Sequence, residues 1–151
     1  MKPEVWGPPI WTLFHTLAEK INESHYSTIG LELYGYIKKI CGYLPCPECS
    51  QHATRFLASI KLENVNTKDG LRKILYIFHN VVNVRKKKSL FLFEKLNDYK
   101  NKNIIQVFNR FISHYKTSTG NMKLITDSFQ RQMIIKNFRK WFLTNYKSFN
   151  G

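Results

Sequence analysis

Hydrophobic residues recur at intervals of three and four along almost the whole chain, which is the spacing of amphipathic helices. The pattern predicts four helices in the first part of the chain, at about 8–21, 29–43, 46–60 and 67–82. Pro8 and Pro9 mark the expected start of the first helix, because proline is favoured in the first helical turn. A short helix is expected at 90–99, and two longer amphipathic helices at 104–115 and about 127–146. No strand–helix–strand alternation is visible, so the sequence predicts an all-α protein.

The length of 151 residues fits one domain, or one compact domain with an extension. No stretch approaches the ~20 apolar residues that a membrane span needs, and the N-terminus lacks the pattern of a secretory signal. Three cysteines also argue against a disulfide-rich secreted scaffold. We therefore expect a soluble protein that is not secreted and has no membrane partner.

The net charge of +14 is unevenly distributed. Residues 1–99 carry 14 basic and 9 acidic side chains, whereas residues 100–151 carry 10 basic side chains and one acidic side chain, Asp127. This step predicts a core domain at 1–99 and a basic helical extension at 100–151. Basic surface is typical of proteins that bind nucleic acid or an acidic partner, and it also simply keeps a protein in solution. The extension carries aromatic stripes, so we expect it to fold against the core or a second subunit, with nucleic-acid binding as the alternative.

The sequence Cys46-Pro47-Glu48-Cys49 lies at the predicted start of the third helix. With Cys46 at the N-cap, Pro47 takes the first helical position, where its missing N–H costs nothing. A helix N-terminus stabilises a thiolate, so this position favours redox chemistry. We expect Cys46 to be exposed and to meet the substrate, and Cys49 to look inward.

Two other interpretations of these cysteines remain open. Cys46, Cys49 and His52 form a C-x2-C-x2-H string that could bind zinc, although no second Cys/His pair supplies the remaining ligands of a closed site. The pair could also be inert. Cys41 falls on the apolar face of the second helix, where it either packs in the core or serves as a resolving or shuttle thiol.

Two further helical faces could hold a planar cofactor. Trp11 and His15 are four residues apart and share one face, and His79 and Asn83 repeat this spacing on another helix. The basic run 85–88 follows and could neutralise a pyrophosphate. Each feature alone also fits a simpler interpretation, because a helical tryptophan usually packs in the core and a basic run usually lies in solvent.

Together these residues resemble the Erv/ALR family of flavin-linked sulfhydryl oxidases. Segment 6–18, WGPPIWTLFHTLA, is similar to the family motif G-x3-W-x3-H-x2-A, and CPEC is similar to its redox turn. Segment 79–83, HNVVN, is similar to its H-N-x-V-N motif. The resemblance covers about residues 5–99 and is closest to the short forms of large cytoplasmic DNA viruses.

The resemblance implies a four-helix bundle with a short fifth helix, non-covalently bound FAD and a homodimer. Cys46 and Cys49 would be the catalytic residues, and no metal would take part. The residues implied to contact FAD are Gly7, Ile10, Trp11, His15, His79, Asn80, Val82, Asn83, Arg85, Lys88 and Tyr99.

The expected function is therefore the oxidation of protein thiols. Electrons would pass from the substrate to the Cys46–Cys49 disulfide, to FAD and to O₂, giving H₂O₂. No separate shuttle CxxC is visible, which indicates a protein thiol substrate or a small thiol carrier protein as partner. The viral resemblance points to the virus factory in the host cytoplasm, and to the virion as a second location. A zinc-stabilised module and a basic nucleic-acid-binding helical module are the alternatives.

Overall fold

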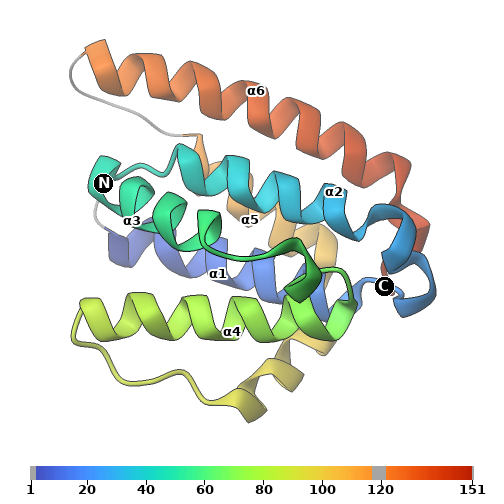
Figure 1. Ribbon diagram of the computed structural model, residues 1–151. Helices are drawn as coiled ribbons and strands as arrows, with labels where there is room; N and C mark the ends of the chain where they lie inside the picture. Colours follow the sequence, from blue (N-terminus) through green and yellow to red (C-terminus); the bar gives the residue numbers. More distant parts are fainter. Residues whose placement is uncertain (1–2, 117–121, 151) are drawn as a thin grey trace.

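A computed structural model describes residues 3–116 and 122–150 and shows a helical protein (Figure 1). Its α-helices are α1 (Pro3–Lys20), α2 (Glu23–Gly42), α3 (Pro47–Ala58), α4 (Lys68–Arg85), α5 (Ile104–Tyr115) and α6 (Met122–Thr144). Short 3-10 helices are η1 (Leu62–Asn64), η2 (Phe93–Asn101) and η3 (Tyr146–Ser148). The only β structure in the described segments is a single antiparallel bridge between Ile21 and Phe149. The prediction of an all-α protein is confirmed.

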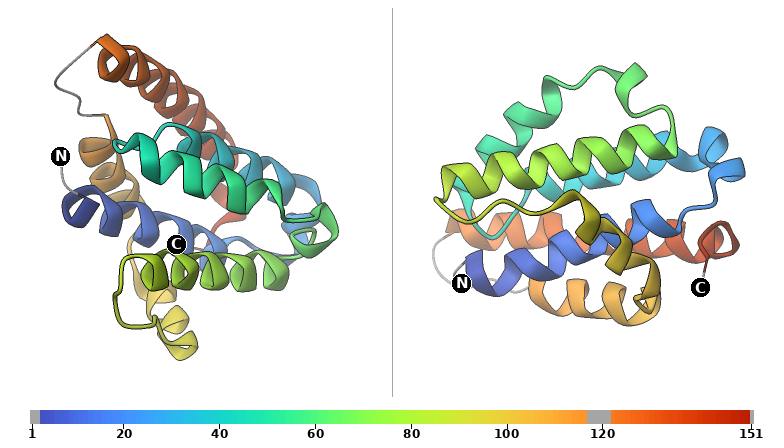
Figure 2. Two further views of the ribbon diagram at one scale, coloured as in Figure 1. Left: turned by 60° about the vertical axis from the view of Figure 1, so that its left-hand side comes forward. Right: turned by 90° about the horizontal axis from the view of Figure 1, so that it is seen from below.

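Helices α1 to α4 form a bundle that the last two helices extend (Figure 1). α1 packs on α4, and α2 packs on both α3 and α4. α5 lies along α1 on the side away from α3, and α6 lies along α2 (Figure 2). η2 follows the loop after α4 and packs against α1. The helical C-terminal extension predicted from the sequence is therefore present, and it covers two helices of the bundle.

Local side chains begin several helices where the sequence provides a cap. Asn22 Oδ1 accepts a hydrogen bond from Ser24 N, and Thr67 Oγ1 accepts one from Gly70 N at 3.0 Å. Asn103 Oδ1 likewise accepts from Gln106 N at the start of α5. Each cap supplies an acceptor to a backbone N–H that has no partner within the helix. These caps set the boundaries of α2, α4 and α5.

The predicted start of the first helix was wrong. α1 begins at Pro3, so Pro8 and Pro9 lie inside it. Their missing N–H groups would have bonded the carbonyls of Glu4 and Val5, and both of these residues are exposed, so water can take the vacated bonds. α2 also begins earlier than predicted, at Glu23, because Asn22 caps it.

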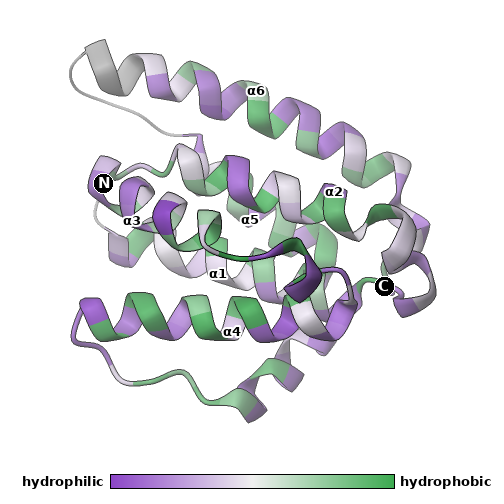
Figure 3. Ribbon diagram, viewed as in Figure 1, coloured by the Kyte–Doolittle hydropathy of each residue, from purple (hydrophilic) through white to green (hydrophobic). Residues whose placement is uncertain are grey.

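One apolar core runs through the bundle and the extension. Phe108, Phe111, Phe138 and Phe142 from α5 and α6 pack together, with Phe108 and Phe142 stacked at 4.8 Å between ring centroids. Helix faces alternate between hydrophobic and hydrophilic, and no described helix is hydrophobic along its whole length (Figure 3). None of the described helices combines the length and the hydropathy that crossing a membrane requires.

A buried ion pair joins α1 and α4, the two helices that carry most of the candidate site. The Glu19 carboxylate of α1 is almost fully buried and accepts a hydrogen bond from Arg72 Nε of α4. Lys68 Nζ also donates to the Glu19 carbonyl at 2.9 Å. Because removing one partner would leave a buried charge unpaired, this contact fixes α1 and α4 side by side.

Candidate active site

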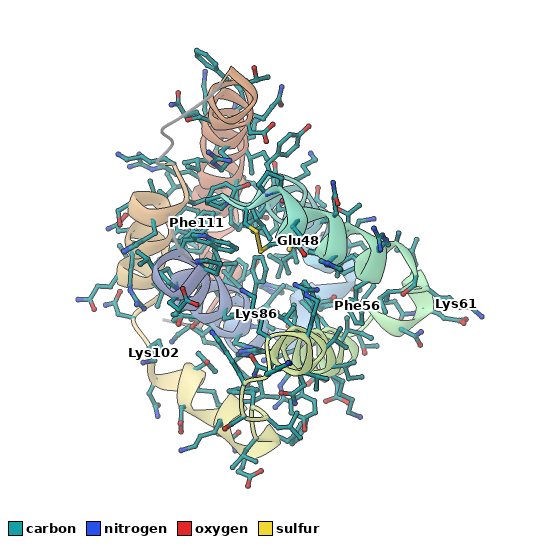
Figure 4. All side chains as sticks on the ribbon, turned by 90° about the vertical axis from the view of Figure 1, so that its left-hand side faces the viewer. Glu48, Phe56, Lys61, Lys86, Lys102 and Phe111 are labelled. Carbon is teal, nitrogen blue, oxygen red and sulfur yellow. A yellow bond between two sulfur atoms is a disulfide. The ribbon has the colours of Figure 1, made fainter. Side chains whose placement is uncertain are left out.

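The Cys46–Cys49 pair closes a rigid turn at the N-terminus of α3. Cys46 is the N-cap, its Sγ accepts a hydrogen bond from Cys49 N at 3.2 Å, and the two sulfur atoms form a disulfide. Ser50 Oγ accepts from Leu44 N at 2.7 Å and so ties the preceding turn to the helix. Figure 4 shows the disulfide close to Glu48, at the end of the bundle where Lys86 also lies. A thiolate released here would be stabilised by the positive end of the helix dipole.

The two cysteines differ in what they face. Cys49 lines an apolar cavity formed by α1, the end of α2, α3, α4 and the turn before α3. Its other lining residues are Trp6, Gly7, Ile10, Trp11, Phe14, Cys41, Leu44, Ala53, Phe78, Val82, Arg85 and Lys86. Cys46 is half-buried rather than exposed as predicted, because it packs against the core beside its partner.

A second, more polar cavity adjoins the first. It is lined by Pro3, Gly7, Pro8, Trp11, Thr12, His79, Val82, Asn83, Lys86, Lys88 and Tyr99. Gly7, Trp11, Val82 and Lys86 line both cavities. A Cβ added at Gly7 would meet nothing within 4 Å, so the space between the two cavities is open at that residue. The lining therefore changes from apolar near Cys49 to polar near His79 and Asn83.

A stack of aromatic rings forms the wall between α1 and α4. Trp11 and His79 lie parallel, with centroids 4.1 Å apart and an interplanar angle of 5°. Phe91, from the loop after α4, stacks on His79 at 4.6 Å. His15 Nε2 and His79 Nδ1 are 2.9 Å apart, and the Tyr99 ring lies 4.9 Å from His15. Residues distant in sequence are thus assembled into a surface suited to a planar ring.

Both histidines in this stack are neutral near pH 7. Burial, with His79 nearby, lowers the pKa of His15 to about 3. Burial and the positive charge of Lys88 lower the pKa of His79 to about 4. In a neutral pair one imidazole donates its N–H and the other accepts, so the 2.9 Å contact satisfies both nitrogens. The pair therefore carries no net charge, and one ring proton lies in the hydrogen bond between the two imidazoles.

Comparison with known proteins gives a consistent result. The family model of the Erv1/Alr family matches residues 8–103. The chain belongs to the Erv1/Alr family. A protein of invertebrate iridescent virus 6, assigned as an FAD-linked sulfhydryl oxidase, is 30% identical over 94 residues, which are 58% of this chain and 85% of that protein. This membership confirms the resemblance drawn from the three motifs, and the chain is an FAD-linked sulfhydryl oxidase by family.

Other viral relatives agree. A probable FAD-linked sulfhydryl oxidase of vaccinia virus is 33% identical over 84 residues, covering 55% of this chain and 81% of its own length. The FAD-linked sulfhydryl oxidase of African swine fever virus is 28% identical over 96 residues, covering 64% of this chain and 77% of its own length.

The residues around the two cavities fit the family cofactor, FAD. An isoalloxazine is planar and apolar enough for the cavity beside Cys49, and a pyrophosphate needs cations, which Arg85, Lys86 and Lys88 provide. Trp6 Nε1 is buried there without a hydrogen-bond partner, so a donor is available at the apolar end. The chemistry of the lining therefore matches both ends of the cofactor.

Most of the residues implied to contact FAD line these cavities. Ile10 and Arg85 line the apolar cavity, and His79, Asn83, Lys88 and Tyr99 line the polar one, while Gly7, Trp11 and Val82 line both. His15 and Asn80 line neither. His15 instead contacts His79 through the hydrogen bond between their ring nitrogens. Asn80 forms two hydrogen bonds with the backbone of Phe91. Its Oδ1 accepts from Phe91 N at 2.7 Å, and its Nδ2 donates to Phe91 O at 3.0 Å.

Trp6, Lys86 and Phe91 belong to the site but are not among the residues implied to contact FAD. Lys86 lies inside the basic run that was noted, so its position in both cavities could have been expected. Trp6 stands beside the first motif. Phe91 carries no sequence signal, because its place depends on how the loop after α4 folds back onto Asn80.

The alternative roles of His52 and Cys41 find little support. His52 Nε2 lies 3.7 Å from Glu48 Oε1, and in the described part of the chain no three His, Cys, Asp or Glu side chains gather as metal ligands would. Cys41 is buried on the wall of the apolar cavity, and burial raises the pKa of its thiol. A protonated thiol is a weak nucleophile, which favours core packing for Cys41.

Proposed function

We propose that this chain oxidises pairs of thiols in protein substrates and that O₂ is the final electron acceptor, reduced to H₂O₂. The observation that carries the proposal is the position of Cys49, which closes the redox turn and at the same time lines the apolar cavity. Electrons delivered to this cysteine therefore arrive next to the place proposed for the flavin.

The first step is thiol–disulfide exchange at Cys46. A substrate thiolate attacks Cys46 Sγ, the Cys46–Cys49 bond breaks, and Cys49 leaves as a thiolate at the helix N-terminus. A second substrate thiolate then attacks the mixed disulfide at the substrate sulfur and releases Cys46. The substrate has lost two electrons and two protons, and the enzyme dithiol has gained the two electrons.

The cofactor would be held by residues of both cavities. Trp11 and His79, stacked on each other, would contact a heteroaromatic ring together with Asn83, and Arg85 and Lys88 would neutralise the pyrophosphate. Asn80 would act through Phe91, which it fixes against the His79 ring. When bound, FAD supplies a two-electron acceptor that can be reoxidised by O₂.

Substrate, assembly and location follow from the family and remain proposals. The physiological partner would be a protein thiol substrate or a small thiol carrier protein, and the enzyme would be a homodimer. The viral relatives favour the host cytoplasm as its location, where a dedicated oxidase is needed because glutathione keeps thiols reduced.

Purified protein tests the proposal directly. It is expected to be yellow, to release FAD on denaturation, and to consume O₂ when given dithiothreitol, forming one H₂O₂ for each disulfide. A colourless preparation that neither binds added FAD nor consumes O₂ would refute the proposal, and release of zinc on denaturation would support the alternative module.

A further inference from the structure

Apart from the two cavities proposed for FAD, a third depression lies beside the redox turn. Its volume is about 410 Å³, and it is lined by Gly42, Tyr43, Pro47, Ser50, Gln51, Thr54, Arg55 and Asp127. We call it the α3–α6 groove. Asp127 belongs to α6, so the groove is formed jointly by the redox helix and the C-terminal extension.

The α3–α6 groove and the apolar cavity lie on opposite faces of α3. At 3.6 residues per turn, Cys49 and Ala53 share one face, and Pro47, Gln51 and Thr54 lie on the other side of the helix. The two spaces have no lining residue in common. Pro47, next to Cys46 in the redox turn, lines the groove, and Cys49 lines the apolar cavity, so the turn lies beside both spaces.

The extension is fixed firmly where it forms the wall of the groove. Arg131 of α6 is almost fully buried; its guanidinium donates to the Tyr43 carbonyl at 3.3 Å and lies over the Tyr115 ring at 5.9 Å. Tyr115 in turn donates its hydroxyl to the Ile40 carbonyl at 2.9 Å. Both acceptors belong to the end of α2 and the turn that leads into Cys46, so α6 cannot shift without disturbing that turn.

The lining of the groove is polar. Gln51, Thr54 and Arg55 are exposed side chains that can hydrogen-bond a peptide backbone, whereas Asp127 is buried and forms the α6 wall of the groove. Its composition suits an extended polypeptide that places a cysteine at Pro47, the residue next to Cys46.

We propose that the α3–α6 groove binds the cysteine-bearing segment of the protein substrate and that the C-terminal extension thereby selects substrates. This inference rests on the proposed thiol oxidase activity. The segment lies extended along α3 with polar residues around its cysteine, and the incoming thiolate attacks Cys46 from the side opposite the flavin. Exchange then proceeds with the electron balance given above.

Blocking the groove separates this idea from the oxidase activity itself. Thr54→Trp places a bulky ring in the groove, and Ala58→Trp places the same ring on an exposed position of α3 outside it. Each variant is assayed with dithiothreitol and with a reduced peptide that carries a Cys-x-x-Cys pair between polar residues. Thr54→Trp is expected to raise the KM for the peptide about tenfold or more, which corresponds to about 1.4 kcal/mol. Its kinetics with dithiothreitol, its FAD content and both activities of Ala58→Trp should stay near wild type.

Equal peptide KM values for Thr54→Trp and Ala58→Trp would overturn the proposal. If Thr54→Trp loses its helical circular dichroism, Gln51→Trp gives the same test from the same wall. The α6 wall is tested with Asp127→Asn, which keeps the shape and removes the charge. Asp127→Asn is assayed with one peptide that has basic residues beside its cysteines and one that has acidic residues there. If its KM for both peptides equals that of the wild type, α6 takes no part in substrate selection. Absence of dithiothreitol oxidation in the wild type would instead refute the oxidase function.

Discussion

At the scale of single residues, the two sulfur atoms of the redox turn have separate tasks although they share one bond. Cys49 is directed to the apolar cavity, and Cys46 caps the helix. Cys46→Ser and Cys49→Ser should each abolish O₂ consumption with dithiothreitol, because neither thiol alone can form the reducible disulfide. Both variants should stay helical and yellow. Full turnover by both would contradict the assignment, and Cys41→Ser, which replaces one sulfur atom on the wall of the apolar cavity, is expected to keep most activity.

The polar cavity makes a second residue-scale prediction. His79→Ala and Asn83→Ala should weaken FAD binding, since each removes a group that faces the proposed cofactor. The loss of one or two buried hydrogen bonds costs about 1–3 kcal/mol, or roughly 5- to 150-fold in Kd. Titration of apoprotein with FAD measures the change. His52→Ala, which alters a histidine outside both cavities, should bind FAD as wild type does, and unchanged Kd values in both test variants would move the site elsewhere.

The His15–His79 pair predicts how stability depends on pH. Both pKa values are lowered by burial from 6.5, to about 3 and about 4, so the unfolded chain takes up protons below pH 6.5 before the folded protein does. The free energy of unfolding should therefore fall as the pH decreases from 6.5 to 5, by up to about 1.4 kcal/mol per pH unit for each histidine. Urea unfolding of the apoprotein at several pH values checks this. His15→Phe should reduce the slope, and a stability that is constant between pH 6.5 and 5 would contradict the prediction.

The residues that the sequence could and could not predict differ in a physical way. Trp11, His79 and Asn83 sit on helices at regular spacing, so their shared faces follow from the helical repeat. Phe91 sits in a loop, and it reaches the His79 ring only because Asn80 bonds its backbone in two places. Such loop contacts depend on tertiary geometry and leave no periodic signal in the sequence.

At the scale of the helices, boundaries were predictable where a cap and an apolar stripe coincide. α5 lies at 104–115 as predicted, because Asn103 caps it and its buried residues recur at helical spacing. The start of α1 was predicted wrongly because Pro8 and Pro9 were interpreted as a start signal. The free-energy cost of a proline inside a helix depends on whether water can reach the carbonyl groups that the proline leaves without a hydrogen bond. The segment predicted as a short helix at 90–99 is the 3-10 helix at 93–101, since its packing against α1 decides its form.

The contact between α1 and α4 gives a stability prediction at this scale. Arg72→Met leaves the Glu19 carboxylate buried without its partner and should lower the free energy of unfolding by about 3 kcal/mol or more. Lys73→Met breaks the exposed pair with Asp69 in the same helix and should cost no more than about 1 kcal/mol. Urea denaturation of the two variants provides the comparison. Equal effects would mean that the buried pair contributes no more than a surface pair does.

At the scale of the whole molecule, the charge step at 99/100 does not coincide with a gap in packing. The apolar core continues from α1 and α2 into α5 and α6. The chain also closes on itself at its end, where Asn22 N donates to the Ser148 carbonyl and Asn150 N donates to the Lys20 carbonyl. The sequence indicated a folded extension through its aromatic stripes, but not which helices it would cover, because each amphipathic face could equally have met a second subunit. The division into a domain at 1–99 and an extension at 100–151 stays a prediction.

Removing residues 100–151 therefore tests whether the bundle of α1 to α4 stays folded and soluble without the extension. A chain ending at Tyr99 would expose the faces of α1 and α2 that α5 and α6 cover, and it would deprive the buried Lys20 ammonium of the carbonyls of Lys100 and Asn150. We expect this variant to aggregate or change its oligomeric state and to unfold at lower temperature, as size-exclusion chromatography with light scattering and circular dichroism would record. The full chain should resist proteolysis within α5 and within 126–144 of α6. A truncated protein that keeps its FAD, solubility and oligomeric state would show that the packing is dispensable. Steeply salt-dependent DNA binding that disappears on truncation would favour nucleic acid as the partner of the extension.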